Sequence, residues 1–344
     1  MKYKFEYNID FISELKGHNG PITSLVCSED KNGVPLLFSG SEDTSIIVWK
    51  LNFKEGTSEK DKYSNQNETI IKSKIIIKKH NNFITSLSLN SDNTQLISSS
   101  LDNSIIIWDI NHLNPDSIIN VSKSIFLSAI FNPDNPDDSI IISSDKKKKL
   151  KYYNSKGNLI YCDKNLDVNV TCFLNIKKNK KNYFAVGLSD GRVKIYDDNF
   201  ALYREIPIYN QIKYDNNKLQ SKEEESISVA SLTIDDEGEY LFIGYRNGII
   251  RVNQLTENIP NDEEENCKEI MKIGVTINNI LFENKYFMVL FIGTNKGLKI
   301  KKIKGEIIYE DNSSPCLSLC FDKNKNYLFA GYKNGIIRVY NINN

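Results

Sequence analysis

SGSEDTSIIVWK (residues 39–50) and SSLDNSIIIWDI (residues 99–110) decide the fold of this chain, because they are two copies of one phrase. Each copy has serines at the end of a strand, an aspartate in a turn, and a run of β-branched residues that leads to a tryptophan. The chain has only two tryptophans, Trp49 and Trp108, and they take the same place in the two copies. Such a repetition is typical of a protein built from structural repeats.

Weaker copies of the phrase follow. They are SDKKKKLKYYN (144–154), LSDGRVKIYD (188–197), YRNGIIRVNQ (245–254), TNKGLKIKKI (294–303) and YKNGIIRVYN (332–341). The positions that close the seven phrases are Trp49, Trp108, Tyr153, Tyr196, Asn253, Lys301 and Tyr340. A repeat of about 40–45 residues is typical of a propeller in which each repeat forms one four-stranded blade. The sequence therefore predicts an all-β fold, a single seven-bladed β-propeller over residues 1–344.

The propeller is expected to close on its own N-terminal segment. The last unit ends at Tyr340–Asn344 after three strands, and an unpaired edge would invite aggregation. FISELKG (11–17) is well placed to supply the fourth strand. Three polar stretches, residues 51–74, 204–226 and 256–268, interrupt the repeat and are expected to be surface loops.

Composition limits the partners that the chain can have. Lysine plus arginine and aspartate plus glutamate both number 44, so a nucleic-acid contact must come from a local basic patch. There is no run of 18 apolar residues and no signal-peptide pattern, so no membrane partner is expected. The six cysteines lack CxxC spacing and are expected to be free thiols in a reducing cytosol.

Two histidines precede the two best copies of the phrase and are predicted to be structural. His18 lies in LKGHNG (15–20), and His80 lies in a weaker copy of that turn. A buried imidazole needs an acceptor and a buried carboxylate needs a donor, so a histidine and an aspartate satisfy each other. The expected hydrogen-bonded chains are His18–Asp43–Trp49 and His80–Asp102–Trp108.

A catalytic interpretation of these residues is the weaker one. Ser39 or Ser98 near a His–Asp pair would suggest a nucleophile, but the arrangement recurs from blade to blade as an architectural element does. The third histidine, His112, is expected to be exposed and without a partner. The chain has no phosphate loop, HExxH, GxSxG or paired metal ligands. We therefore expect no catalytic residues, no cofactor, no metal and no small-molecule substrate.

Clustered lysines are the most marked charge feature. Lys146–Lys149 fall in the turn between the second and third strands of the third blade, on the rim where Lys16, Lys78 and Lys79 are also expected. These lysines either form a solvated surface or contact RNA phosphate, which would make binding salt-dependent. The candidate RNA-binding lysines are thus Lys16, Lys78, Lys79, Lys146, Lys147, Lys148 and Lys149.

Both ends of the chain resemble one family. LKGHNG, SGSEDTSIIVWKL and HNNFITSLSLNSDNTQLISSSLDNSIIIWDI are similar to the first two blades of the receptor for activated C-kinase family. NYLFAGYKNGIIRVYN is similar to the last blade of that family, the Gβ-like WD40 propeller scaffolds of the eukaryotic small ribosomal subunit. The similarity extends over nearly the whole chain and is weakest across blades three to five. It implies a WD40 propeller.

The resemblance also implies a function. It predicts a cytoplasmic, non-catalytic scaffold on the head of the 40S subunit, in contact with ribosomal RNA and ribosomal proteins, with protein kinases and translation factors as further partners. In that family a basic pair flanks the aspartate of the first blade's turn and contacts the ribosome. In this chain Glu42 and Thr44 hold those positions, so Thr44 is a candidate contact and the lysines are expected to compensate. A free cytosolic WD40 signalling adaptor is the alternative, which the exchange at Glu42 and Thr44 would fit.

Overall fold

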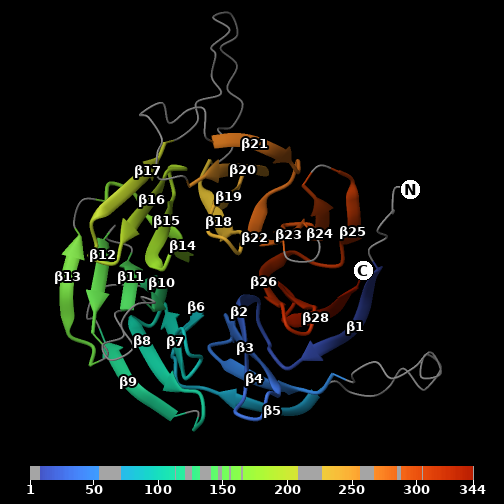
Figure 1. Ribbon diagram of the computed structural model, residues 1–344. Coiled ribbons are helices and arrows are strands. Elements are labelled where there is room, and N and C mark those ends of the chain that lie inside the picture. The colour runs from blue at the N-terminus through green and yellow to red at the C-terminus, as the bar shows by residue number, and fades with distance from the viewer. Residues whose placement is uncertain are drawn as a thin grey trace, which may run out of the picture.

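The fold is a ring of antiparallel sheets (Figure 1). The computed structural model describes residues 8–53, 71–112, 114–120, 126–131, 141–145, 149–154, 156–163, 166–207, 227–255, 267–284, 288–303 and 305–343. Its strands form seven four-stranded sheets, which we call blades one to seven. The predicted all-β propeller is confirmed.

Within each blade the strands follow one another from the centre of the ring outward. Blade one holds β2 (Ile22–Glu29), β3 (Pro35–Ser41), β4 (Ile46–Leu51) and β5 (Ile71–Ile77), and blade two holds β6 (Ile84–Leu89), β7 (Gln95–Ser100), β8 (Ser104–Asp109) and β9 (Asn114–Asn120). Blade three holds β10 (Phe126–Phe131), β11 (Ile141–Asp145), β12 (Lys149–Tyr153) and β13 (Leu159–Asp163), and blade four holds β14 (Val170–Lys178), β15 (Lys181–Leu188), β16 (Val193–Asp197) and β17 (Leu202–Ile206). Blade five holds β18 (Val229–Ile234), β19 (Tyr240–Tyr245), β20 (Ile249–Gln254) and β21 (Cys267–Lys272). Blade six holds β22 (Ile277–Glu283), β23 (Val289–Thr294), β24 (Gly297–Lys302) and β25 (Ile307–Asp311). Blade seven holds β26 (Cys316–Asp322), β27 (Tyr327–Tyr332), β28 (Ile336–Asn343) and β1 (Asn8–Lys16).

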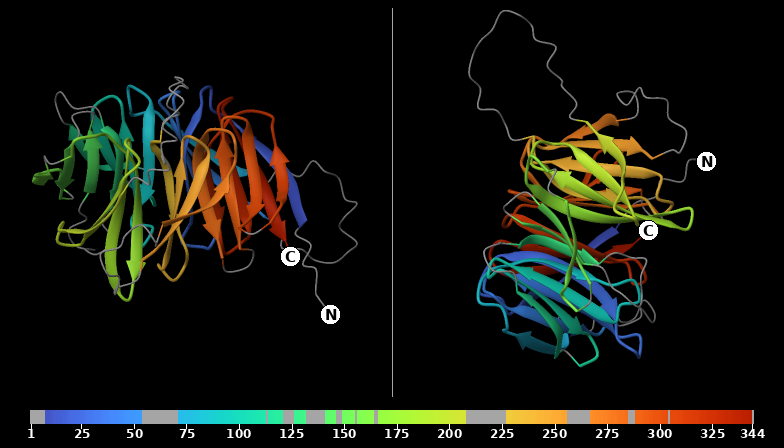
Figure 2. Two further views of the ribbon diagram at one scale, coloured as in Figure 1. Left: turned by 90° about the horizontal axis from the view of Figure 1, so that it is seen from above. Right: turned by 90° about the vertical axis from the view of Figure 1, so that its left-hand side faces the viewer.

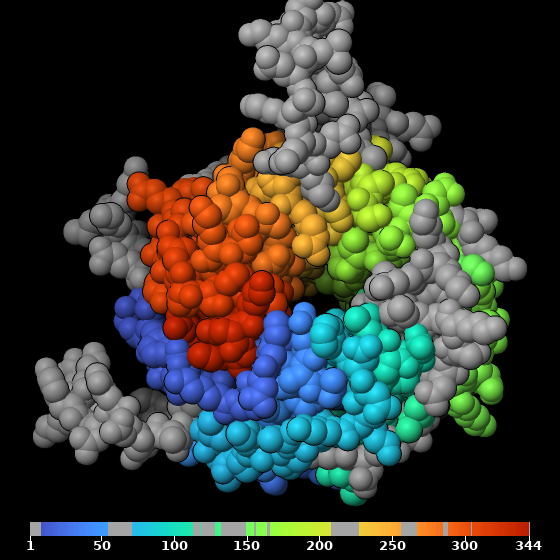
Figure 3. Space-filling view, turned by 180° about the vertical axis from the view of Figure 1, so that it is seen from behind, coloured from blue at the N-terminus to red at the C-terminus, as the bar shows by residue number. Residues whose placement is uncertain are grey.

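Blade seven joins the two ends of the described chain. β1, which overlaps the segment expected to close the ring, pairs antiparallel with β28 and forms the outer strand of this sheet. Leu15 lies opposite Ile337, and both side chains are fully buried. The space-filling view shows the blue N-terminal part packed directly against the red C-terminal part (Figure 3). Pairing of β1 covers the edge that β28 would otherwise expose.

The apolar core lies between neighbouring blades. One buried cluster combines Tyr327 and Phe329 of blade seven with Leu37 and Trp49 of blade one. Another cluster joins blades one and two, and every blade contributes strand residues to such a cluster. β-Branched and aromatic side chains suit these positions because they fill the pleated surface of a sheet on each side.

Every inner strand carries a register shift near its start, and the shift helps to join the blades. In β2 the shift lies between Ile22 and Ser24. Thr23, at this bulge, donates its hydroxyl to the carbonyl of Ile84 in blade two at 2.7 Å, and Ser24 accepts the amide of Leu87 at 3.0 Å. A bulge redirects the side chain that it carries, in this case toward the neighbouring sheet.

The ring has two faces, and the strands run from one to the other (Figure 2). On one face the chain passes from blade to blade and turns between the second and third strands of each blade. We call it the tetrad face, after the hydrogen-bonded groups of four residues around His18 and His80 that are described below. On the opposite face the chain turns between the first and second strands and between the third and fourth; we call it the groove face.

The predicted loop boundaries are wrong at their edges. Residues 71–74 belong to β5, residues 204–206 to β17, and residues 267–268 to β21. These are outer strands with one face toward solvent, so their polar side chains gave no apolar alternation to recognise. Residue 51 likewise ends β4, residues 52, 53 and 207 are described outside strands, and residues 54–70, 208–226 and 256–266 lie outside the described part of the chain.

Candidate functional site

The tetrad face of blade one is organised by a buried chain of hydrogen bonds. His18 lies in the turn that leads into β2, and its Nδ1 is 2.9 Å from Asp43 Oδ2. Its Nε2 is 2.8 Å from Ser39 Oγ, and Trp49 donates its indole N–H to the same hydroxyl at 2.8 Å. With the Nδ1 tautomer, His18 donates to Asp43 and accepts from Ser39, so every group in the chain is satisfied.

Blade two repeats the arrangement. His80 Nδ1 lies 3.0 Å from Asp102 Oδ2, and His80 Nε2 lies 2.7 Å from Ser98 Oγ. Trp108 donates its indole N–H to Ser98 at 2.8 Å. The predicted chains joined tryptophan to histidine and aspartate without a fourth member. The structure corrects this, because a serine links the indole to the imidazole and the carboxylate forms no hydrogen bond with the tryptophan.

These tetrads hold the turns of the face in place. Asp43 also accepts the backbone amide of Asn19 at 2.8 Å and the hydroxyl of Ser45 at 2.6 Å, so one carboxylate joins the turn before β2 to the turn after β3. These hydrogen bonds outweigh the desolvation of Asp43 and hold its pKa below the usual value. The role of the carboxylate is thus to anchor Glu42 and Thr44 on a rigid turn, where both side chains are partly exposed.

Both tetrad histidines are neutral in the folded protein. Burial is the largest influence on each, and it lowers the pKa of His18 and of His80 below 6.5 although Asp43 and Asp102 act in the opposite direction. The unfolded chain therefore binds protons more tightly at these two side chains than the folded chain does. Their contribution to stability is complete above pH 6.5 and is lost as the pH falls below it.

This linkage gives a pH prediction. Between about pH 6.5 and 5, the free energy of unfolding should fall by up to about 1.4 kcal/mol per pH unit for each histidine. The measurement is urea denaturation followed by tryptophan fluorescence at pH 8, 7, 6 and 5. A His18→Gln/His80→Gln variant is the control: it should be less stable at pH 7 but lose little more on acidification. Equal slopes for the two proteins would contradict the assignment.

The third histidine, His112, forms a side-chain contact with a neighbouring carboxylate. His112 is mostly exposed, as expected, but its Nδ1 forms an ion-pair contact with Asp109, three residues earlier at the end of β8. The prediction that it has none was therefore wrong. Residues three apart in a turn lie close together, so Asp109 was a possible partner, but the prediction considered only residues distant in the sequence.

The predicted lysines are only partly placed by the structure. Lys78 and Lys79 are exposed where β5 leads into the turn of His80. Lys16 ends β1 on the same face and pairs with Glu14 at 2.9 Å, which reduces its free charge. Lys149 is not a turn residue, because it pairs with Asp145 as the first residue of β12. Lys146, Lys147 and Lys148 lie outside the described residues.

Three further cations lie on this face and were not predicted from the sequence. Arg246, Lys296 and Lys333 lie in the turns between the second and third strands of blades five, six and seven, and all are exposed. No carboxylate in the described part of the chain forms an ion pair with them. In blade four, by contrast, Arg192 is held by Asp190 and Glu205. The signal was present in the repeated phrases as YRNG, TNKG and YKNG.

Local backbone structure fixes where these cations stand. In blade seven the amide of Gly335 donates to the carbonyl of Tyr332, so Lys333 occupies a tight turn, and Lys333 donates its own amide to Pro315 at 2.9 Å. Gly335 has a φ of 82°, and a Cβ there would lie 2.9 Å from the carbonyl oxygen of His18. Arg246 is held in the same way, because its backbone amide donates a hydrogen bond to the carbonyl of Ser228 at 2.9 Å. Each turn therefore projects one cation from a rigid base.

This face presents positive charge to solvent. Unpaired exposed cations can contact phosphate, and the buried serines and histidines of the tetrads are closed to solvent and already satisfied. Among the described residues no group of three or more histidine, cysteine, aspartate or glutamate side chains is arranged to hold a metal ion. Within the same ranges, no helix is long and apolar enough to cross a membrane.

Comparison with known proteins gives partial matches. The profile of the family described as WD domain, G-beta repeat matches residues 9–50, 71–109 and 304–341, which correspond to most of blades seven, one and two. The chain is 31% identical over 101 residues to "Cross-pathway control WD-repeat protein 2" of Flammulina velutipes, covering 29% of this chain and 28% of that protein. The chain thus carries WD40 repeats on a β-propeller.

Two further relatives have different roles in their names. "Small ribosomal subunit protein RACK1" of Dictyostelium discoideum is 27% identical over 99 residues, 29% of this chain and 26% of that protein. "Ribosome biogenesis protein WDR12 homolog" of Drosophila persimilis is 28% identical over 153 residues, 44% of this chain and 34% of that protein. The three matches cover between 26% and 34% of the relative's own length. They support a WD-repeat protein and do not select one of these roles.

Proposed function

We propose that this WD-repeat propeller is a non-catalytic, cytoplasmic scaffold of the small ribosomal subunit, bound through its tetrad face to ribosomal RNA. The observation that carries the proposal is the set of exposed cations without carboxylate partners among the described residues, above all Arg246, Lys296 and Lys333. Each is fixed at its base by a rigid turn, and cations held in this way suit phosphate contacts. The similarity to a small ribosomal subunit protein supports the same choice of partner.

The other basic residues of the proposal stand beside this set. Lys78 and Lys79 extend the charged surface to blade two, and Lys16 and Lys149 contribute at blades seven and three. Lys146, Lys147 and Lys148 are proposed contacts from sequence. Thr44 would contribute only a neutral hydrogen bond. Contacts with ribosomal proteins, protein kinases and translation factors belong to the same proposal.

A free cytosolic signalling adaptor is the second candidate function. Blades one and two favour it, because their turns on the tetrad face carry Glu42, Asp43 and Asp102 and no cation between the strands. The acidic turns of blades one and two repel phosphate. RNA binding on this face would therefore depend on the cations of blades five to seven and on Lys78 and Lys79.

Sedimentation of cell extract through a sucrose gradient at low salt separates the two candidates. Wild-type protein is expected to travel with the small subunit, whereas an Arg246→Glu/Lys296→Glu/Lys333→Glu variant should remain near the top, because three attractive contacts become repulsive. Raising the salt should release wild type as well.

The matched control reverses three exposed lysines on the groove face, Lys156→Glu/Lys177→Glu/Lys181→Glu. It makes the same change in net charge and should sediment like wild type. If wild type itself stays at the top at low salt, the ribosomal proposal fails and the adaptor takes its place. If both variants are released equally, net charge rather than the tetrad face is responsible.

A further inference from the structure

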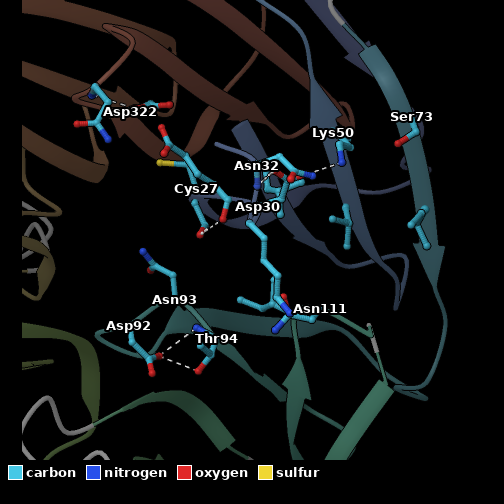
Figure 4. A pocket seen from close by; sticks show the side chains of 18 of the residues that line it. Cys27, Asp30, Asn32, Lys50, Ser73, Asp92, Asn93, Thr94, Asn111 and Asp322 are labelled. Carbon is cyan, nitrogen blue, oxygen red and sulfur yellow. Dashed lines mark hydrogen bonds and ion pairs between the residues drawn. The ribbon is translucent and has the colours of Figure 1, made fainter. Parts of the chain in front are cut away.

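The groove face holds a cavity that the proposed function does not use. Turns of blades seven, one and two enclose a volume of about 770 Å³, which is within the range of about 300–1,000 Å³ typical of ligand pockets. Figure 4 shows Asp322 and Cys27 on one side of it, the turn of Asp30 beside them, and the turn of Asp92 opposite. Three blades therefore contribute acidic side chains to one space.

Asp322 is the most informative of these residues. It is 8% exposed and lines the cavity. Its Oδ1 accepts the backbone amides of Asn324 and Lys325 at 3.0 and 3.3 Å, whereas its Oδ2 accepts no hydrogen bond from the residues that the structure describes. Burial, with a smaller influence of Glu29, raises the pKa of this carboxyl above the usual value. This oxygen is reachable from solvent and lies at the wall of the cavity, so a donor group of a ligand can bind it.

Three lysines line the cavity, of which two are paired with carboxylates and the third, Lys31, is exposed and forms no ion pair with a described residue. Lys50 pairs with Asp30 inside it, and Lys323 is drawn away to Asp236 in the turn of blade five. Glu29, beside Asp322, is exposed and forms no ion pair with any described residue. Lys325 lowers the pKa of Asp322, but its influence is smaller than that of Glu29 in the opposite direction. Three carboxylates of the cavity, Glu29, Asp92 and Asp322, form no ion pair with a described residue, against one such lysine, so the unpaired charge of the cavity is negative.

The remaining walls favour a peptide over a small ion. Val48, Leu36 and Ile110 form buried apolar surface, and Ile75 of β5 is 47% exposed at the outer end. Asparagine side chains can donate to and accept from an extended backbone. The four that line the cavity are Asn32, Asn93, Asn111 and Asn324. The apolar wall can contact aliphatic side chains, the asparagines can bind an extended backbone, and the carboxylates can bind a cationic side chain. Together these groups suit an extended peptide.

We propose that this cavity, which we call the groove, binds an extended segment of a partner protein in which a lysine or arginine lies next to aliphatic residues. The cationic side chain would reach Glu29 and Asp322, and its ammonium or guanidinium group would donate to the free Oδ2. The aliphatic neighbours would cover Ile75 and the apolar wall. Charge complementarity selects the cation, and apolar burial supplies a large part of the affinity.

Selection from a random heptapeptide phage library tests the proposal on the full chain. Wild-type protein is the bait, and a Glu29→Gln/Asp322→Asn variant is the counter-selection. The Asp322→Asn change keeps a side-chain carbonyl that still accepts both backbone amides, so the turn is retained while the charge is removed. Enriched peptides should carry lysine or arginine next to an aliphatic residue and bind the variant about tenfold more weakly or worse.

The control is Asp198→Asn, which removes an exposed carboxylate in the turn after β16 and should leave peptide binding unchanged. Thermal unfolding of all proteins establishes that the variants are folded. Absence of any enrichment over the variant would overturn the proposal, and so would enriched peptides without a cation. The variants do not touch the tetrad face, so this result is independent of the ribosomal proposal.

Discussion

Deleting residues 1–15 is expected to unfold the whole propeller rather than one end of it. The deletion removes all of β1 except Lys16, and with it the pairing to β28. It also removes Leu15, whose full burial stabilises the fold by about 1.5–3 kcal/mol, and the ion pair of Glu14 with Arg338 at 3.0 Å. Total stabilities are about 5–15 kcal/mol, so the combined loss should leave little folded protein at 25 °C.

Circular dichroism and size-exclusion chromatography measure this outcome. A deletion of residues 1–7, which precede β1, is the control and should melt within a few degrees of wild type. A protein without residues 1–15 that unfolds cooperatively at the wild-type temperature would contradict the role of β1. Its exposed β28 edge should also promote self-association, which chromatography would detect.

Replacing Asp311 by alanine should cost about 1–3 kcal/mol of the free energy of unfolding. Asp311 ends β25 of blade six and is 8% exposed. It accepts hydrogen bonds from the hydroxyls of Tyr332 and Tyr340 and from Arg338, each at 2.6 Å. Burial opposes its charge, but these donors more than compensate and hold its pKa far below the usual value.

The cost arises because the variant removes the shared acceptor of three donors, of which Arg338 keeps Glu14 and Ser313 while the two tyrosine hydroxyls keep only each other. One of the two buried hydroxyls would then have no acceptor among the described residues, which costs the desolvation of that group. Urea denaturation measures the effect, and Asp167→Ala, an exposed carboxylate before β14, is the control with an expected change within about 0.5 kcal/mol. A loss below about 1 kcal/mol for Asp311→Ala would show that the network does not hold blades six and seven together.

This network takes the place of the tetrad in blade seven, and the sequence alone did not reveal it. Tyr340 closes its phrase where Trp49 closes the first, so the loss of the tryptophan was visible. Its replacement by a tyrosine–aspartate–arginine group depends on Asp311, which belongs to the previous blade and has no place in the phrase. Contacts between repeats cannot be read from the pattern within one repeat.

Local repetition explains what could be predicted. Strand positions followed from the phrase, and the partnership of His18 with Asp43 followed from the need of each for the other. Ser39 could have been found as well, because in both good copies a serine precedes the tryptophan by ten residues. Ser39 was considered only as a possible nucleophile, because the sequence did not show which group the indole of Trp49 would contact.

The two proposed binding surfaces were harder to predict from the sequence. Arg246, Lys296 and Lys333 form a set only when the turns of different blades are known to open on one face. The groove is even harder to predict from the sequence, because Asp30, Asp92 and Asp322 lie in turns that are far apart in the chain. Neither surface carries a local motif, and only the ring arrangement brings blade seven beside blade one.

The most direct measurement for the central claim is the affinity of the labelled protein for purified small ribosomal subunits over a series of salt concentrations. If the tetrad face contacts phosphate, the logarithm of the association constant should fall linearly with the logarithm of the salt concentration. The Arg246→Glu/Lys296→Glu/Lys333→Glu variant should bind more weakly, with a slope shallower by about two to three, while the groove-face control keeps the wild-type slope. No binding at the lowest salt, or equal slopes for all three proteins, would contradict the claim.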